Sequence, residues 1–586
     1  MAVMDLIRDT AFGQIVRVVT RRKFLQYPEE KDPELWKQWV SEEKSGNAAR
    51  YGAVEPPEEE EGDGNSDYEK DKEKTEDRRD REQSTANSAA TSKTRIPEDA
   101  TVNETSGVRV DPEKGMDKTV IHFLPDDPGN PQNWSPRKKY FVTFQICLMT
   151  TGIYIGSAIY TPGVQEVMKV FGVSQVVATL GLCLFVAGYG LGPMIWSPMS
   201  EIPYFGRNPI YMGTLFIFVM FQIPTALASN LGMLLAFRFL TGFFGSPVLA
   251  TGGATIADMY SPRKRAYAMS VWGVAAVCGP TLGPLVGGFA AQHEDWTWTI
   301  WELMWLSGTV WVFLMFFLPE TSANNILYRR TKRLRQLTGN DKLICQPELI
   351  AESMSRNEII QMSLVRPFTL NFSEPMVFLL NLYIALIYGL LYIWFESFPI
   401  VFVGIYKFNL GEQGLAFLGI FVGAVLVVPP FFWWLHKYLE PKFDENGECQ
   451  PELRLPAACV GGFFIPIALF WFGWASRASV HWIVPIIGSG FFSVGTFLLF
   501  NSVLNYLPDA YPEHAASVLA GNDLFRSSFG AGFPLFASAM YKKLGVAWAS
   551  SLLAFLSIAF IPIPFILYKY GATLRKNHSK HARKDI

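Results

Sequence analysis

The sequence predicts an all-α membrane protein in which two bundles of six helices follow a polar N-terminal region. Hydrophobic runs fill residues 140–570, and most approach the length of about 20 apolar residues that crosses a bilayer core of about 30 Å. A hydrophilic stretch, residues 319–373, divides these runs into two sets of six. Within hydrocarbon each run must pair its own backbone N–H and C=O groups, so each run is predicted to be a helix.

The N-terminal region, residues 1–139, is polar and is expected to lie in the cytosol. Apolar residues between Met4 and Val19 recur at helical spacing beside basic residues, which predicts a short amphipathic helix. This helix could lie on the acidic inner leaflet or pack on the protein's own cytosolic face. Residues 52–118 hold almost no bulky apolar side chains and are expected to form a disordered acidic tail.

The remaining chain divides into two predicted bundles, 140–318 and 374–570, joined by a cytosolic central loop, 319–373, and followed by a cytosolic tail, 571–586. The spans expected in the first bundle are 140–160, 174–197, 209–228, 231–257, 266–290 and 297–318. Those expected in the second are 375–400, 414–436, 455–476, 481–506, 514–540 and 545–569. Lys and Arg concentrate in the loops on the N-terminal side, so both termini are predicted to be cytosolic.

The composition excludes several classes of function. A net charge of −2, carried in tails and loops, gives no sign of nucleic-acid binding. There is no G-x-x-x-x-G-K-[ST], H-E-x-x-H or G-x-S-x-G pattern, so neither an enzyme nor a cofactor or metal site is expected. Without an ATP site, uphill transport would have to be driven by an ion gradient.

A loop after the second predicted span carries the first motif, which runs from Gly192 through Glu201 and Gly206 to Arg207. Its glycines and prolines predict a tight turn with opposite charges at the membrane face. It resembles the signature loop of the major facilitator superfamily, although Glu201 stands where that family has Asp and two extra residues precede Gly206. An ordinary polar turn is the alternative.

The fifth predicted span carries a stripe of small residues that lets helices approach closely. The stripe resembles the antiporter motif of the same superfamily, with simple small-residue packing as the alternative. Its residues are Gly273, Gly279, Pro280, Gly283, Pro284, Gly287 and Gly288.

Charged residues inside predicted spans are candidates for proton coupling, since a charge in hydrocarbon is costly and is rarely kept without a role. Arg238 in span four, followed four residues later by glycine, resembles a motif linked in this superfamily to proton transfer. Glu396 in span seven has no local partner and is the better carboxylate candidate. Asp523 in span eleven is the third candidate, but Arg526 is three residues away on the same helix face and could neutralise it.

Aromatic side chains crowd the second bundle, and some of them must face a central cavity, where they could bind flat apolar cations. The predicted substrate contacts are Tyr388, Tyr392, Trp394, Phe395, Phe497, Asn522 and Arg526.

Taken together, the motifs resemble the fungal twelve-span drug:H⁺ antiporters of the benomyl and fluconazole resistance type. Phe317-Leu-Pro-Glu-Thr321, which closes span six, and Ala520-Gly-Asn-Asp-Leu-Phe-Arg526 belong to the same resemblance. It implies a monomeric plasma-membrane exporter that exchanges small amphipathic drugs or toxins for protons, among membrane lipids. A polyamine or other metabolite exporter of the same fold, or a non-transporting nutrient sensor, is the alternative.

Overall fold

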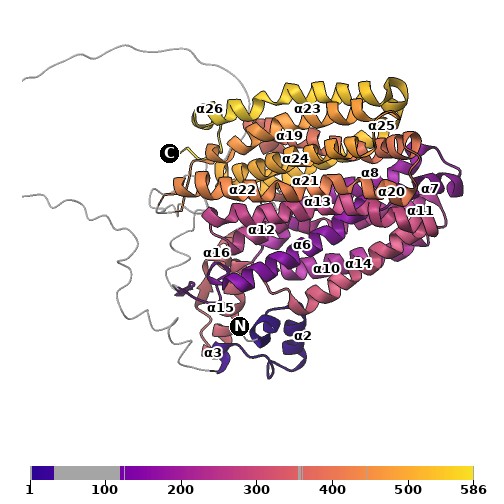
Figure 1. Ribbon diagram of the computed structural model, residues 1–586. Coiled ribbons are helices and arrows are strands. Elements are labelled where there is room, and N and C mark those ends of the chain that lie inside the picture. Colours follow the sequence, from indigo (N-terminus) through magenta and orange to yellow (C-terminus); the bar gives the residue numbers. More distant parts are fainter. Residues whose placement is uncertain are drawn as a thin grey trace, which may run out of the picture.

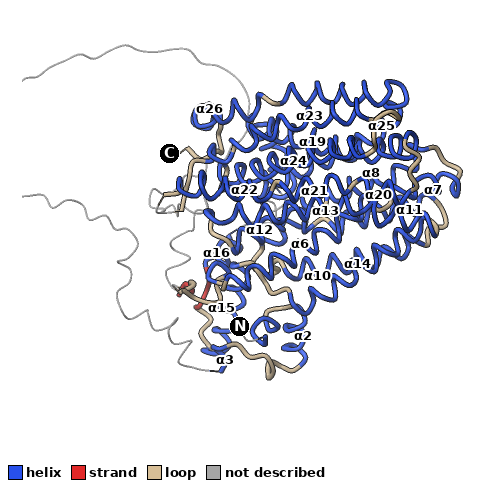
Figure 2. The backbone as a smooth tube through the Cα atoms, viewed as in Figure 1, coloured by secondary structure: helices blue, strands red, loops and turns tan. Residues whose placement is uncertain are grey.

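The computed structural model describes residues 3–31, 119–124, 126–353, 358, 361–444 and 447–584. The tail predicted over 52–118 lies outside these residues. Helices make up nearly all of the described backbone (Figure 2). The termini of the described chain lie toward one end of the helical bundle, which we call the terminal face, and α7 (Val164–Phe171) lies at the opposite end, the distal face (Figure 1).

The first six crossings correspond to the spans that the sequence predicts, and two of them are interrupted. The helices are α6 (Pro136–Ala158), α8 (Gln175–Leu191) with α9 (Pro193–Glu201), α10 (Asn208–Ala226), α11 (Leu231–Gly245) with α12 (Pro247–Met259), α13 (Pro262–His293) and α14 (Trp296–Phe317). The interruptions fall at Pro193 and Pro247, because proline donates no backbone hydrogen bond.

The second half begins with α19 (Pro375–Phe398), which continues as a π-helix through Pro399–Ile405. The eighth crossing is built from the short helices α20 (Leu410–Ala416), α21 (Leu418–Leu426) and α22 (Val428–Trp434). It is followed by α23 (Pro456–Ala475), α24 (Ile483–Ala510), α25 (Ala515–Phe560) and α26 (Pro562–His578).

The described residues contain eleven helical stretches long and apolar enough to cross a membrane, and the last of them, Ala515–His578, is 64 residues long. At 1.5 Å per residue it would measure about 96 Å, three times the thickness of a bilayer core. Gly545 breaks it with a left-handed φ of 72°, which turns the chain back. The stretch therefore makes two crossings, which brings the total to twelve.

The central region, 319–373, predicted as a cytosolic loop between the bundles, has secondary structure of its own. It contains α15 (Ala323–Thr338), β2 (Leu343–Cys345), α16 (Gln346–Ser353) and α18 (Arg366–Ser373). Strand β2 pairs in parallel with β1 (Thr119–Ile121), and the two strands bury a small core with Leu327 and Leu334 of α15. The apolar side chains of α15 cover the sheet, although the helix is also rich in basic residues. The terminal face therefore carries a two-stranded sheet beside the helical bundle (Figure 2).

The predicted N-terminal amphipathic helix is two helices, α1 (Val3–Arg8) and α2 (Ala11–Val19), followed by α3 (Pro28–Lys31). Thr10 separates them, because its side chain accepts a hydrogen bond of 3.1 Å from the Gly13 amide and so caps α2. Thr10 also forms a β-bridge with Pro319 at the end of span six. One side of the segment therefore contacts the protein itself.

The C-terminal tail folds back onto the second half. The Glu374 carboxylate, just before α19, accepts hydrogen bonds from the backbone amides of Lys580 and His581 at 3.1 and 3.2 Å. The Tyr511 hydroxyl donates to the same carboxylate at 3.2 Å. This buried carboxylate fixes the tail beside α24.

Candidate functional site

A central cavity of about 50 Å³ lies between the two halves, enclosed by α6, α13, α19, α24 and α25. Its walls are mainly aromatic and aliphatic. The residues that line it are Tyr154, Met269, Trp272, Gly273, Ala276, Val277, Pro280, Tyr388, Leu391, Thr496, Phe497, Phe500, Asn501, Leu504 and Arg526. Three predicted substrate contacts, Tyr388, Phe497 and Arg526, are among them.

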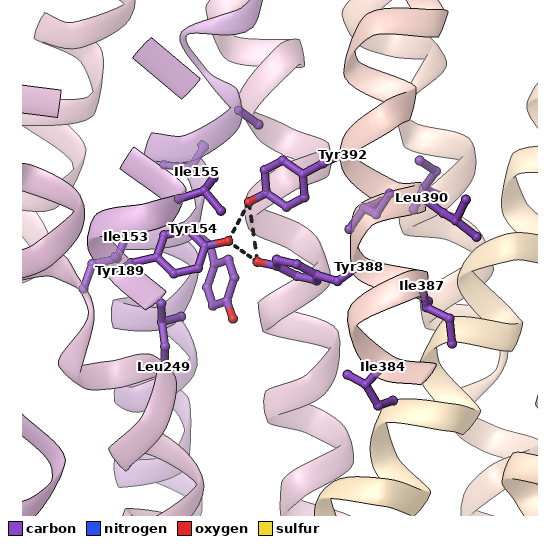
Figure 3. Close-up of a cluster of buried hydrophobic side chains, with 14 of the residues drawn as sticks. Ile153, Tyr154, Ile155, Tyr189, Leu249, Ile384, Ile387, Tyr388, Leu390 and Tyr392 are labelled. Carbon is purple, nitrogen blue, oxygen red and sulfur yellow. Dashed lines mark hydrogen bonds between the residues drawn. The ribbon is translucent and has the colours of Figure 1, made fainter. Parts of the chain in front are cut away.

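Three tyrosine hydroxyls join the two halves beside this cavity (Figure 3). The Tyr189 hydroxyl, from α8, lies 2.9 Å from that of Tyr392 on α19 and also hydrogen-bonds Tyr388. The Tyr392 hydroxyl donates to Ser157 of α6 at 3.0 Å. Spans one, two and seven are thus linked by one buried polar cluster, of which the sequence predicted Tyr388 and Tyr392 as site residues but not Tyr189 or Ser157.

The Asp523 and Arg526 side chains form the ion pair that their spacing allowed. Arg526 donates to the Asp523 carboxylate through Nε at 2.6 Å and to the Tyr154 hydroxyl through Nη2 at 3.2 Å. Its guanidinium carbon lies 5.4 Å from the centre of the Tyr388 ring and 6.0 Å from that of Phe500. One cation therefore already occupies the aromatic wall of the cavity.

Glu396 lies closer to the distal face and is held from the other half of the molecule. Its carboxylate accepts hydrogen bonds from Gln175 Nε2 at 3.1 Å and from the Thr179 hydroxyl at 3.3 Å, both on α8. The Gln175 side-chain oxygen Oε1 in turn accepts from the Ser538 hydroxyl at 3.1 Å and from Lys542 Nζ at 3.2 Å, both on α25. No described basic side chain forms an ion pair with Glu396 directly, so its charge is stabilised by neutral donors.

Arg238 is fully buried inside the first half. It donates to the carbonyl oxygens of Gly181 and Gly156 at 2.9 Å each, and its guanidinium carbon lies 4.6 Å from the centre of the Phe185 ring. No described carboxylate pairs with it. The residue ties α11 to α8 and α6 and stands apart from the central cavity.

The motif loop forms a network at the terminal face. Arg207 Nε donates to Asp258 of α12 at 2.6 Å, so the partner is not Glu201, which is exposed. Burial disfavours the charged form of Arg207, but the negative charge and hydrogen bond of Asp258 favour that form more strongly. The pKa of Arg207 is therefore raised. Glu320, just after span six, accepts from the Arg207 backbone amide at 3.1 Å.

Two glycines of the motif loop allow close approach. Gly206 has a φ of 77°, and a Cβ there would lie 2.6 Å from the side chains of Asn325 and Glu320. At Gly192 a Cβ would lie 2.0 Å from the Ser246 hydroxyl, where the two broken spans cross.

The glycine stripe of α13 faces two different helices. Toward α6, a Cβ on Gly279 would lie 2.2 Å from the Tyr154 Cβ, and one on Gly287 would lie 2.2 Å from the Ile159 carbonyl oxygen. Toward the second half, a Cβ on Gly288 would lie 2.5 Å from the Leu410 carbonyl oxygen. At the distal end, α13 and span eight therefore meet backbone to backbone.

At the terminal end, side chains bridge the same pair of spans. Glu440, after α22, accepts from Lys264 at 2.5 Å and from the Tyr267 hydroxyl at 3.0 Å, and its carboxylate lies 3.5 Å from Arg263. The side chains of Lys264 and Arg263 are 55% and 51% exposed and that of Glu440 is 10% exposed, so water reaches this bridge from the basic side.

Three predicted substrate contacts lie elsewhere. Trp394 is fully buried against Phe472 of α23 and Phe492 of α24, with ring centres 5.4 and 4.4 Å away. Phe395 stacks on Phe417. Asn522 donates to Asn381 at 2.8 Å. These residues do not line the central cavity.

Comparison with known proteins identifies the family. The protein-family model for the "Major Facilitator Superfamily" matches residues 146–534 of this chain. The chain belongs to the Major Facilitator Superfamily. Transporter mfs1 of Schizosaccharomyces pombe is 49% identical over 463 residues, which cover 78% of this chain and 87% of the relative. Fluconazole resistance protein 1 of Saccharomyces cerevisiae is 44% identical over 487 residues, covering 82% and 88%.

Among solved structures, the proton:xylose symporter XylE from E. coli matches with a TM-score of 0.53 at 15% identity, covering 75% of this transporter and 96% of that chain. That likeness concerns the fold alone. The relatives confirm the resemblance to fungal drug transporters that the motifs predicted. The transporter is a multi-pass membrane protein of this family.

Sequence reasoning missed Asp258, Gln175 and Tyr189. Asp258 is an acidic residue at the end of the apolar fourth span, and this position could have suggested a partner for Arg207. Gln175 and Tyr189 are uncharged, and their partners lie in the other half of the chain, so no local pattern marked them.

Proposed function

We propose that this transporter exports small amphipathic drugs, of the azole and benomyl kind, in exchange for protons. The names of the relatives support the substrate class. The observation that carries the proton coupling is Glu396, which is buried and unpaired by any described cation and connects the two halves through Gln175 and Thr179.

Protonation of Glu396 would weaken this connection. The ionised carboxylate only accepts hydrogen bonds, and here both oxygens receive one from α8. A proton on either oxygen removes the negative charge and part of the accepting capacity of the carboxyl group, so the hydrogen bonds from Gln175 and Thr179 become weaker. Gln175 is also held by Lys542, the basic group nearest to this cluster, so a change at Glu396 reaches α25 as well. Proton binding to Glu396 would thus weaken the contact between α19 and α8 near the distal face.

The cavity favours neutral substrates over polycations. The described residues that line it include no carboxylate, and Arg526 already lies against the Tyr388 and Phe500 rings. A polyamine would meet this guanidinium and find no unpaired counter-charge, because Asp523 is bound to Arg526. A neutral aromatic drug can stack on the same rings and accept a hydrogen bond from the tyrosines. This disfavours the polyamine alternative.

The structure represents a closed state of such a cycle. A drug-sized ligand occupies a cavity of about 300–1,000 Å³, whereas this one has about 50 Å³. Substrate entry therefore requires the two halves to separate at one face. The terminal face carries Arg207, Arg263 and Lys264, which supports a cytosolic location for it and for both termini. The proposed location is the plasma membrane, and the proposed unit is a monomer.

The test is efflux of a labelled neutral azole from energised cells, with and without a protonophore, between about pH 5 and 8. Glu396→Gln keeps the size of the side chain but cannot titrate, so we expect slower efflux that no longer depends on pH. Glu412→Gln is the matched control, because Glu412 is an exposed carboxylate of α20, close to the distal face. Parental, protonophore-sensitive efflux in Glu396→Gln would refute the coupling role.

A further inference from the structure

The helix α2 turns its apolar side outward. Val18 and Val19 are each 77% exposed and Ile15 is 51% exposed, whereas Arg17 on the opposite side is only 4% exposed. The Arg17 guanidinium binds Glu30 at 2.7 and 2.9 Å inside the segment. In water this orientation is unfavourable, since the apolar area of Ile15, Val18 and Val19 is left in solvent. The outer side of α2 must therefore meet an apolar medium.

The position of α2 identifies that medium. It packs beside the terminal end of α14 (Figure 1), where the Phe12 ring lies 4.7 Å from that of Phe316. Phe316 and Val312 of α14 are 37% and 49% exposed on a membrane-spanning helix, so they face lipid. The exposed side of α2 continues this lipid-facing surface at the level where the span ends.

Three basic residues follow the end of α2 almost directly. Arg21, Arg22 and Lys23 are exposed, in a turn where Arg21 and Arg22 have positive φ values of 49° and 63°, and Arg22 also donates a hydrogen bond to the Gln336 side chain of α15. Phe24, next in the chain, is 56% exposed. A cluster of basic residues beside apolar side chains is typical of helices that bind at the headgroup level of an anionic membrane.

The segment is also fixed to the rest of the protein. Arg333 of α15 donates to Glu29 at 2.7 and 2.9 Å, and its guanidinium carbon lies 3.6 Å from the centre of the Tyr27 ring. The Tyr27 hydroxyl donates to Asp9 at 2.7 Å. These contacts hold α2 in one orientation, so its apolar side cannot turn inward.

We propose that residues 11–24 form a membrane-interface anchor that binds the anionic phospholipid surface at the terminal face. Ile15, Val18 and Val19 insert among the acyl chains below the headgroups, and Arg21, Arg22 and Lys23 bind lipid phosphates or carboxylates. The anchor connects the lipid surface to α15 through Tyr27 and Arg333. This proposal is independent of drug export.

The test measures depth in the full-length protein reconstituted in nanodiscs. A spin label is attached to Val18→Cys, a position that makes little contact within the protein, and for comparison to Asp341→Cys, in the exposed turn after α15. All six native cysteines are buried or half-buried. Collision with oxygen, which concentrates in the bilayer, is compared with collision with a water-soluble nickel chelate.

We expect the Val18 label to be several-fold more accessible to oxygen than to nickel, and the Asp341 label to show the reverse. Replacing part of the phosphatidylcholine with phosphatidylserine should increase the depth at Val18. The triple change Arg21→Gln, Arg22→Gln and Lys23→Gln should remove this lipid dependence. A Val18 label as open to nickel as that at Asp341 would overturn the proposal. Protection from both reagents would also overturn it, since a second copy or another protein would then cover α2.

Discussion

Gly283 lies where α13 crosses α6, and alanine at this position should force the two helices apart. A Cβ added there would lie 2.8 Å from the Ile159 backbone nitrogen and 2.9 Å from the Ala158 Cβ. Carbon atoms pack best at about 3.5–4.0 Å, so the helices must separate locally by about 0.6–1.1 Å. Overpacking of this kind costs about 1–3 kcal/mol. We expect Gly283→Ala to lower the midpoint of thermal unfolding by several degrees, and Gly283→Leu to abolish transport.

Thermal unfolding of the purified protein, followed by tryptophan fluorescence, measures this effect. Gly273→Ala is the matched control on the same helix, because the nearest atom to its Cβ would be the end of the Asn501 side chain at 3.3 Å and not a backbone atom below 3 Å. Equal midpoints for the parent and both alanine variants would show that α6 and α13 are not in rigid contact at Ala158.

Three further predictions concern single contacts. Arg238→Lys should keep part of the transport rate, measured by drug efflux, because lysine retains the charge but cannot bind the Gly181 and Gly156 carbonyls through a planar fork; full activity in Arg238→Ala would contradict a functional role. Asp258→Asn should destabilise the protein by about 1–3 kcal/mol in thermal unfolding, less than a fully buried pair would lose, because the Asp258 side chain is 23% exposed. Burial raises the pKa of Glu374, but the hydrogen bonds that its carboxylate accepts lower it more, so the pKa lies below the ordinary 4.5. The contact between Glu374 and the C-terminal tail should therefore persist at neutral pH and be lost as the pH falls through this lowered pKa. Glu374→Gln should therefore speed trypsin cleavage after Lys580 at pH 7, and an unchanged rate would disprove the attachment.

The membrane spans were predictable because each depends on its own residues. An apolar run of sufficient length must be a helix in lipid whatever it packs against. The last two spans show this, since the predicted gap between residues 540 and 545 ends at Gly545, where the helix breaks. The central region was not predictable in the same way. Strand β1 pairs with residues more than two hundred positions away, and a three-residue strand has no pattern of its own.

The charged residues of the site could be predicted from the sequence, but most of their partners could not. The Asp523–Arg526 pair follows from helical spacing within one span, and the structure contains it. Glu396 was identified as a buried carboxylate, but Gln175 and Thr179 lie on a span of the other half. The direction of Trp394 also depended on neighbouring helices, because an aromatic residue in a span can face lipid, a cavity or the interior of a bundle. Its position among Phe472 and Phe492 came from tertiary packing.

The two ends of the contact between α13 and span eight differ in what it costs to separate them. At the distal end, helix backbones touch through Gly288, and opening would create voids that only lipid or a large rearrangement could fill. At the terminal end, the Lys264 side chain of the Lys264–Glu440 bridge is 55% exposed and the Glu440 side chain 10% exposed, so water can reach the bridge from the lysine side as it breaks. Salt also screens a partly exposed pair of this kind. Separation at the terminal end should therefore cost less free energy than separation at the distal end, and we expect the terminal end of this contact to open first.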